Sequence, residues 1–400
     1  MAKKGRNHLE DLRGASKLAV EATKGVTDLV RAMHHRIASG PGLLGQPLAG
    51  PAGALTGLIY GGIRGVTSLV GASIDLALSQ LAPLLGESAP GPEREAILAA
   101  LNGVLGDYLA STGNPLAIQM QLRRGGQALE LHREALRQRL PQATGKLLVL
   151  VHGSSMGDLQ WSGRGLDIGA ALERDLGYTA VHLRYNSGLH ISTNGRSFAT
   201  LLEALVEEWP VPLEELSLVA HSMGGLVSRS ACHAAAAASQ RWLAKLRNLV
   251  CLGTPHHGAP LERSGNLLDL ALGISSYSAP LARLGKIRSA GVTDLRYGSI
   301  LDEDWEGRDR FEYTEDRRRP VPLPEGVRCF AAAASTARVA GKRLPGDGLV
   351  HVDSALGRSE RPELTLAFPP ERQWIGLGMN HLDLLGRAEV YEVLKGWLAS

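Results

Sequence analysis

Ser222 stands where an apolar strand enters a tight turn and leaves as a helix of small residues. The run is Leu216–Val227, with Ala220 two residues before the serine and Gly224 two residues after it. Small side chains at these two positions are what a strained strand-to-helix turn requires when it raises a serine hydroxyl above the end of a sheet. Such a serine attacks acyl carbon atoms once a neighbouring base removes its proton. The turn therefore predicts chemistry at acyl groups.

An acid and a histidine follow this serine in the order that the chemistry needs. Asp347 lies between two glycines, and His381 comes after the last predicted strand and before the last predicted helix. A serine nucleophile needs an imidazole that takes its proton and a carboxylate that orients the imidazole. We expect Ser222, Asp347 and His381 to form a catalytic triad, in the chain order typical of the α/β-hydrolase fold.

Other acids compete with Asp347 for this position, because Gly-Asp-Gly is a common turn signal by itself. The alternatives are Asp353 and Asp383. Asp383 is only two residues from His381, which makes the geometry of a triad awkward.

The negative charge that develops on the substrate oxygen needs two backbone N–H donors. One donor follows the nucleophile, so we assign it to Met223 at the start of the helix. The other is expected in the loop after the first parallel strand, residues 146–152. We assign it to Ser154, which directly follows His152-Gly153.

Composition limits the other possibilities. The chain has 400 residues, 44% of them apolar, and a formal net charge of +3. It is long enough for two or three folding units, or for one large domain with an extension. No basic run with interleaved aromatic residues indicates a nucleic-acid partner, and Arg317–Arg319 is expected to be a solvated loop. No apolar segment near the N-terminus resembles a signal peptide, so we expect a cytoplasmic protein.

Residues 1–113 are expected to form a helical N-terminal extension. Residues 8–38 are apolar at every third or fourth position, which predicts an amphipathic helix. Residues 43–63 carry no charge, but prolines and glycines interrupt them, which disfavours a membrane span. A short repeat, Gly25–Val30 and Gly65–Val70, is explained by an antiparallel helix pair. The alternative is a face for peripheral contact with a membrane, lipid or polymer-granule surface, which a vesicle-binding assay would test.

Residues 114–400 are expected to form the catalytic domain, an α/β fold with a mostly parallel sheet and helices on both faces. A hairpin over 118–131 and a short helix over 132–140 precede the first parallel strand. A cap is expected at about 259–324, where no strand pattern is found. The further strands are expected at 179–185, 216–221, 248–252, 327–334 and, last, 364–368 with the residues that follow. The helices are expected at 92–110, 164–176, 195–208, 223–239 and 387–398.

The remaining polar motifs favour structural roles. Adjacent histidines such as His256-His257 point in different directions, so a loop at the rim of the site is favoured over a metal site. The acidic run Asp302–Asp304 lacks the ligand spacing of a calcium-binding loop and is expected to be solvated. His221 is expected to pack inside the turn, and the three cysteines are expected to be buried thiols. No cofactor or metal is expected.

These motifs resemble those of the bacterial lipase and esterase branch of the α/β-hydrolase superfamily, and those of the lipase-like domain of inositol deacylases that act on glycolipid anchors. The segments that carry the resemblance are Val151–Gly153, Ala220–Gly225, Leu252–Gly258, Gly346–Val350 and Asn380–Asp383. The resemblance implies the same triad and the hydrolysis of acyl or lipid esters without a metal. An acyltransferase that uses the same triad, and a non-catalytic protein that coats a lipid or granule surface, are the alternatives.

Overall fold

The computed structural model describes residues 92–162, 165–259, 289–308, 315–341 and 344–399. The predicted helix at 8–38, the uncharged stretch at 43–63 and the short repeat lie outside the described residues, so these predictions stay untested. The chain divides into two compact units, and the second comprises Leu98–Ala271 and Arg288–Ser400. None of the helices in the described ranges combines the length and low polarity needed to cross a bilayer.

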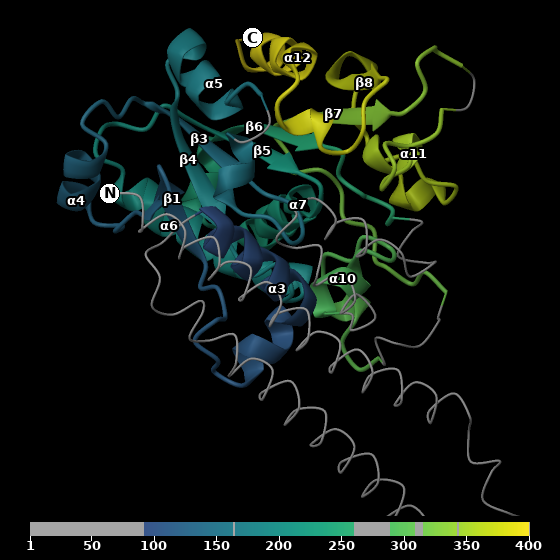
Figure 1. Cartoon of the computed structure of the whole chain (residues 1–400), viewed down its shortest axis with the longest axis horizontal. Coiled ribbons are helices and arrows are strands. Elements are labelled where there is room, and N and C mark those ends of the chain that lie inside the picture. The colour runs from purple at the N-terminus through teal and green to yellow at the C-terminus, as the bar shows by residue number, and fades with distance from the viewer. Residues whose placement is uncertain (1–91, 163–164, 260–288, 309–314, 342–343, 400) are drawn as a thin grey trace, which may run out of the picture. The chain divides into compact units, whose positions relative to one another are not determined.

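The described residues form one sheet of eight strands in the order β2-β1-β4-β3-β5-β6-β7-β8 (Figure 1). The strands are β1 (Gln121–Arg124), β2 (Gln127–Ala128), β3 (Lys146–Val151), β4 (Thr179–Arg184), β5 (Glu215–His221), β6 (Leu246–Leu252), β7 (Arg328–Ser335) and β8 (Gln373–Leu377). β1 pairs antiparallel with both β2 and β4, whereas β4, β3, β5, β6, β7 and β8 are parallel. The predicted hairpin and mostly parallel sheet are therefore confirmed.

The prediction of the last strand is wrong in position. The segment 364–368 is not a strand; Leu366 and Phe368 are buried there as part of the core, and the strand follows at β8. Burial of alternate apolar residues gives a loop the same period as a strand, so the pattern alone does not separate the two.

Helices cover both faces of the sheet (Figure 1). The α-helices are α3 (Pro92–Ser111), α4 (Arg133–Arg139), α5 (Ile168–Leu176), α6 (Ile191–Glu208), α7 (Met223–Ala237), α10 (Ala290–Asp294), α11 (Val352–Ala355) and α12 (Ala388–Ala399). Short 3-10 helices lie at Asp158–Trp161, Arg241–Lys245, Asp302–Asp304, Pro362–Leu364, Pro370–Arg372 and Asp383–Leu385. α5 was predicted at 164–176, and only its start differs: the Asp167 carboxylate accepts from Ala170 N at 2.9 Å and starts the helix later. Gly177, with φ +73°, ends it as predicted.

The central strands are apolar along their whole length because both faces of the sheet are buried. In β3, Leu147 and Val149 face a core shared with α6 and α7, which includes Phe198. Leu148 faces the opposite core, shared with α5 and α12, which includes Leu394. Successive side chains of a strand point to opposite faces, so this run builds both cores at once.

The sheet order changes direction at β3, with β4 on one side and β5 on the other. In open parallel sheets, functional sites form beyond the carboxyl ends of strands at such a point. The loops that follow β3, β4 and β5 therefore meet at one edge.

The second half of α3 packs into the sheet unit. Asn102 bridges the chain by donating to Leu116 O at 2.8 Å and accepting from Ile118 N at 2.9 Å. Asn186, in the loop after β4, donates to Gly106 O at 2.8 Å. The domain boundary at residue 113 stays a prediction, but α3 from residue 98 onward is joined to the sheet unit by these bonds.

Part of the predicted cap, residues 289–308 and 315–324, is described and contains no strand. Two expectations about its charges are wrong in part: Glu303, Arg317 and Arg319 are exposed as expected, but Arg318 and Asp304 are not. Arg318 is not solvated: its side chain is 9% exposed and pairs with Asp316 at 2.8 Å. Asp304 is buried and accepts hydrogen bonds from Ile300 N and Leu301 N. Backbone donors and a nearby carboxylate replace water for these charges, and such partners are not visible in local sequence.

Candidate functional site

Ser222 occupies a strained turn between β5 and α7. Its backbone has φ 54° and ψ −126°, a conformation that non-glycine residues rarely adopt. Two hydrogen bonds hold it: Ser222 N donates to Leu252 O at 2.8 Å, and Gly225 N donates to Ser222 O at 3.0 Å. The neighbouring strand and the helix thus impose the strain that raises the serine side chain above the sheet.

Small residues around the turn allow the backbones to meet. An ideal Cβ placed on Gly224 would lie 2.6 Å from His152 O and 2.7 Å from Val151 O, so a side chain there would collide with β3 and its loop. Ala220 is fully buried in the strand before the turn. The requirement for small residues at these positions, which the sequence predicted, has this steric cause.

Asp347 and His381 form a buried pair. His381 Nδ1 lies 2.7 Å from Asp347 Oδ2, and their side chains are 5% and 1% exposed. The other carboxylate oxygen accepts from Leu349 N and Val350 N at 2.9 and 2.8 Å. Burial alone would raise the pKa of Asp347, but His381 and these backbone donors hold it below its usual value. The carboxylate is therefore ionised and oriented toward the imidazole.

His381 lies next to the serine turn. His221, the residue before the serine, places its Nε2 3.0 Å from His381 O, and the two rings are 4.6 Å apart between centroids. An ideal Cβ on Gly253, directly after β6, would lie 3.1 Å from His381 Cε1. His381 Nε2 is buried and makes no hydrogen bond with the described residues. The structure thus places the Asp347–His381 pair against the residue before Ser222 and the residue after β6, with His381 Nε2 left without a partner among the described residues.

The two alternative acids are engaged elsewhere. The Asp353 side chain is 76% exposed on α11 and contacts Arg358. Asp383 accepts from Asn380 N at 2.8 Å and closes the turn that carries His381. Only Asp347, of these three acids, hydrogen-bonds to the His381 ring.

The loop after β3 approaches the serine closely. An ideal Cβ on Gly153 would lie 3.0 Å from Ser222 Cβ. His152 Nδ1 lies 2.8 Å from Gly153 O, which belongs to the same peptide unit as Ser154 N. This contact orients the peptide whose N–H was predicted as an oxyanion donor. The second predicted donor, Met223 N, is at the first position of α7, where backbone N–H groups have no partner within the helix.

Residues that the sequence analysis missed support this loop. Tyr185 N donates to His152 Nε2 at 3.3 Å, Tyr185 Oη donates to His152 O at 3.0 Å, and the two rings stack at 4.3 Å. Ser155 N donates to Ser187 Oγ at 2.9 Å. Both partners lie in the loop after β4. Their position beside the β3 loop follows from the strand order, which the local pattern does not reveal.

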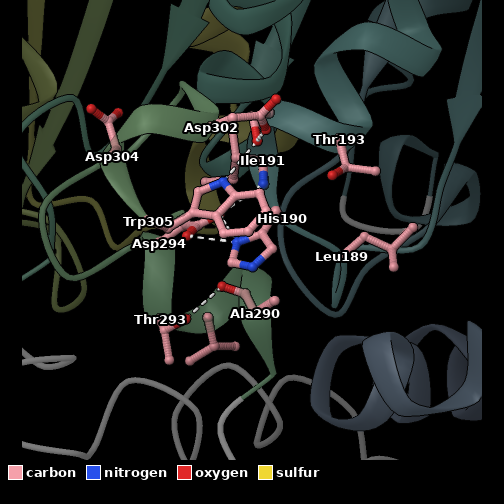
Figure 2. A network of polar contacts seen from close by, with 12 residues as sticks. Leu189, His190, Ile191, Thr193, Ala290, Thr293, Asp294, Asp302, Asp304 and Trp305 are labelled. Atoms are coloured by element: carbon pink, nitrogen blue, oxygen red, sulfur yellow. Dashed lines mark hydrogen bonds and ion pairs between the residues drawn. The ribbon is translucent and has the colours of Figure 1, made fainter. Parts of the chain in front are cut away.

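The loop after β4, which ends at His190, is joined to the base of the cap (Figure 2). His190 Nδ1 lies 3.1 Å from both oxygens of Asp294, and its ring stacks on Trp305 with centroids 3.7 Å apart. Asp294 also accepts from Ile191 N at 2.8 Å, at the first residue of α6. Burial raises the pKa of Asp294. This network positions residues 290–305 against the start of α6.

Neutral buried histidines make stability depend on pH. Burial lowers the pKa of His152 to about 4 and that of His221 to about 3. Between these values and the usual 6.5, the unfolded chain binds more protons than the folded one, so the free energy of unfolding falls as the pH falls. We expect each such histidine to remove up to about 1.4 kcal/mol per pH unit below pH 6.

Urea unfolding of the wild type and of His221→Gln from pH 6 to pH 4.5 measures this effect. The glutamine amide can still donate to His381 O but does not titrate, so we expect a shallower decline for this variant. Exchange of the exposed His233 for glutamine is the matched control and should keep the wild-type slope. Parallel curves for wild type and His221→Gln would contradict the assignment.

No group of three His, Cys, Asp or Glu side chains suited to a metal ion occurs in the described ranges. The three cysteines, Cys232, Cys251 and Cys329, are free and buried, as predicted. His256 is fully buried and lies beside Arg229, not at an open rim.

Comparison with known proteins finds a family match over part of the chain and several similar solved structures. Residues 199–318 match the family described as a PGAP1-like alpha/beta domain. No curated protein sequence matches the chain significantly. The mature form of the Bacillus licheniformis lipase BlEst2 is 18% identical, with 63% of this chain and 91% of that chain covered and a TM-score of 0.41.

Two further solved structures are similar at the same level. Lipase 1 from Pelosinus fermentans is 14% identical over 63% of this chain and 97% of that chain, with a TM-score of 0.37. Phospholipase PlaB from Legionella pneumophila is 18% identical over 52% of this chain and 45% of that chain, with a TM-score of 0.35. The mostly parallel sheet of this chain and the strained serine turn after β5 are features of the α/β-hydrolase fold, as the motifs predicted.

Proposed function

We propose that this protein is a serine hydrolase that cleaves carboxylic esters through Ser222, His381 and Asp347. The observation that carries the proposal is the buried Asp347–His381 pair, which contacts His221 next to a serine held at φ 54° and whose Nε2 has no hydrogen-bond partner among the described residues. A structural histidine–aspartate pair would not require a strained serine next to it. Strain that the surrounding backbone maintains is typical of functional positions.

The proposed reaction begins with proton transfer. His381 Nε2 accepts the Ser222 Oγ proton as the oxygen attacks the ester carbonyl carbon, while Asp347 stabilises the imidazolium. The carbonyl oxygen becomes an oxyanion that accepts from the N–H groups of Met223 and Ser154. The intermediate collapses, His381 returns the proton to the leaving alcohol, and an acyl-serine remains. Water then attacks the acyl-serine and gives a proton to His381. His381 passes this proton to Ser222 Oγ as the bond from the serine to the acyl carbon breaks and the carboxylic acid is released.

The substrate class is proposed as acyl or lipid esters. The three solved structures named above are two lipases and a phospholipase, and the family match includes the serine turn. The same acyl-serine could pass its acyl group to an alcohol in place of water. The cap and the pocket, not the triad, decide which acceptor reaches the acyl group.

A fluorophosphonate probe tests the proposal. We expect covalent attachment to Ser222 in the folded protein, located by peptide mass analysis, because only an activated serine displaces fluoride from such a probe. Heat-denatured protein is the control and should remain unlabelled. Attachment to another serine, or none in protein shown to be folded by circular dichroism, would contradict the proposal.

A further inference from the structure

The second half of α3 lies directly against the loop after β3. Residues 98–106 of this helix are all buried. An ideal Cβ placed on Gly103 would lie 2.0 Å from Ser155 Oγ, 2.8 Å from Ser155 Cβ and 2.9 Å from Ser155 Cα. Non-bonded carbon atoms keep about 3.5–4.0 Å apart. The helix and the loop therefore touch in this way only because residue 103 has no side chain.

Ser155 is the neighbour of an expected oxyanion donor. It directly follows Ser154, whose backbone N–H we propose for that role. Ser155 has φ 57°, a value that non-glycine residues rarely adopt and that the surrounding structure must maintain. Its N–H donates to Ser187 Oγ at 2.9 Å, and Gly103 packs against its side chain. The orientation of Ser154 N thus depends on the contacts that Ser155 makes.

The helix is fixed by contacts that do not involve this loop. Asn102 joins it to Leu116 and Ile118 through the two hydrogen bonds described above. Gly103 O accepts from Ser289 Oγ at 2.6 Å, at the base of the cap. A methyl group added at position 103 would therefore displace the loop after β3 rather than the helix.

α3 also reaches Ser155 through the loop after β4. Asn186 Nδ2 donates to Gly106 O at 2.8 Å, and Asn186 Oδ1 accepts from Gly188 N at 3.0 Å. The residue between these two loop positions is Ser187, which accepts from Ser155 N. The helix therefore supports Ser155 by direct packing and by this chain of hydrogen bonds.

We propose that α3 positions the oxyanion donor Ser154 N, with Gly103 as the positioning residue, an assignment that rests on the proposed function. Gly103 touches neither the substrate nor the reacting atoms; it acts through Ser155. Residues 98–111, which the sequence placed in the N-terminal extension, then serve the reaction itself.

Gly103→Ala is expected to lower kcat on a short p-nitrophenyl ester by about 10²-fold with little change in KM. A displaced donor no longer meets the oxyanion, which forms only during the reaction, so substrate binding is spared. Initial rates and melting temperature measure the effect. Gly396→Ala on α12 is the matched control, because no atom of another described element lies within 4 Å of an ideal Cβ there. It should keep wild-type kcat.

A second substitution tests whether the effect passes through Ser155. Ser155→Gly removes the two side-chain atoms that the new methyl group would meet, and glycine adopts φ 57° without strain. Relative to Ser155→Gly alone, the double variant Gly103→Ala/Ser155→Gly should recover most of the kcat that Gly103→Ala loses. A loss of the same size in both backgrounds would overturn the role of Gly103.

If Gly103→Ala does not fold, Ser187→Ala replaces it, because it removes the acceptor of Ser155 N without adding volume. This variant should lower kcat by about tenfold, the effect of one lost hydrogen bond, again with KM retained. Ser217→Ala is its matched control: Ser217 is also buried and accepts from Asn248 Nδ2 at 2.8 Å, but it lies near the start of β5, away from Ser222. Equal kcat in the two variants would overturn the positioning role of this loop.

Labelling of Ser222 by the fluorophosphonate probe separates the two proposals. If the wild type is labelled but folded Gly103→Ala keeps wild-type kcat, the role of α3 is overturned and the ester hydrolase stands. If the folded wild type is not labelled, the proposed function fails, and the role of Gly103 fails with it. Labelled wild type, slow Gly103→Ala and recovery in the double variant are the expected results.

Discussion

Ser222→Ala is expected to lower kcat on a short p-nitrophenyl ester by about 10⁶-fold, which places it near the detection limit. Alanine has no atom that can form the acyl-enzyme, and His381 alone cannot replace it. The fold should persist, because the bonds that hold this turn, from Ser222 N to Leu252 O and from Gly225 N to Ser222 O, involve only backbone atoms. Initial rates, circular dichroism and melting temperature measure these two outcomes separately.

The matched control is Ser197→Ala, on the exposed surface of α6, which should leave both rate and stability unchanged. Labelling by the fluorophosphonate probe should be lost in Ser222→Ala and retained in the control. Wild-type turnover by folded Ser222→Ala would exclude this serine as the nucleophile.

Asp347→Asn is expected to lower kcat by about 10⁴-fold with little change in KM. The asparagine side chain has the same shape as the aspartate, and its amide oxygen can still accept from Leu349 N and Val350 N. The amide nitrogen, however, would face His381 Nδ1 as a donor, so the imidazole proton moves to Nε2. In that tautomer the histidine cannot take the Ser222 proton.

Asp353→Asn is the matched control, because this acid was the alternative by sequence and its side chain is 76% exposed. It should keep wild-type kcat. A loss in Asp353→Asn as large as in Asp347→Asn, or less than a tenfold loss in Asp347→Asn, would contradict the assigned acid.

Features that depend on neighbouring residues could be predicted from the sequence. The apolar run of β3 and its Gly-rich exit, the alternation of strands and helices, and the turn at Ser222 follow from local side-chain size and polarity. A parallel strand must be apolar on both faces, and a strained turn tolerates only small neighbours, so these patterns have few other structural explanations. The α/β-hydrolase fold was predictable for this reason.

Features that depend on residues far apart in the chain were decided by the tertiary structure. The hydrogen bond of His381 to Asp347, not to Asp353, depends on where two loops end after folding. The burial of Arg318 and Asp304 depends on backbone groups that pack around them. Local sequence predicts that a charged side chain is solvated, because the partners that would let it be buried come from distant segments.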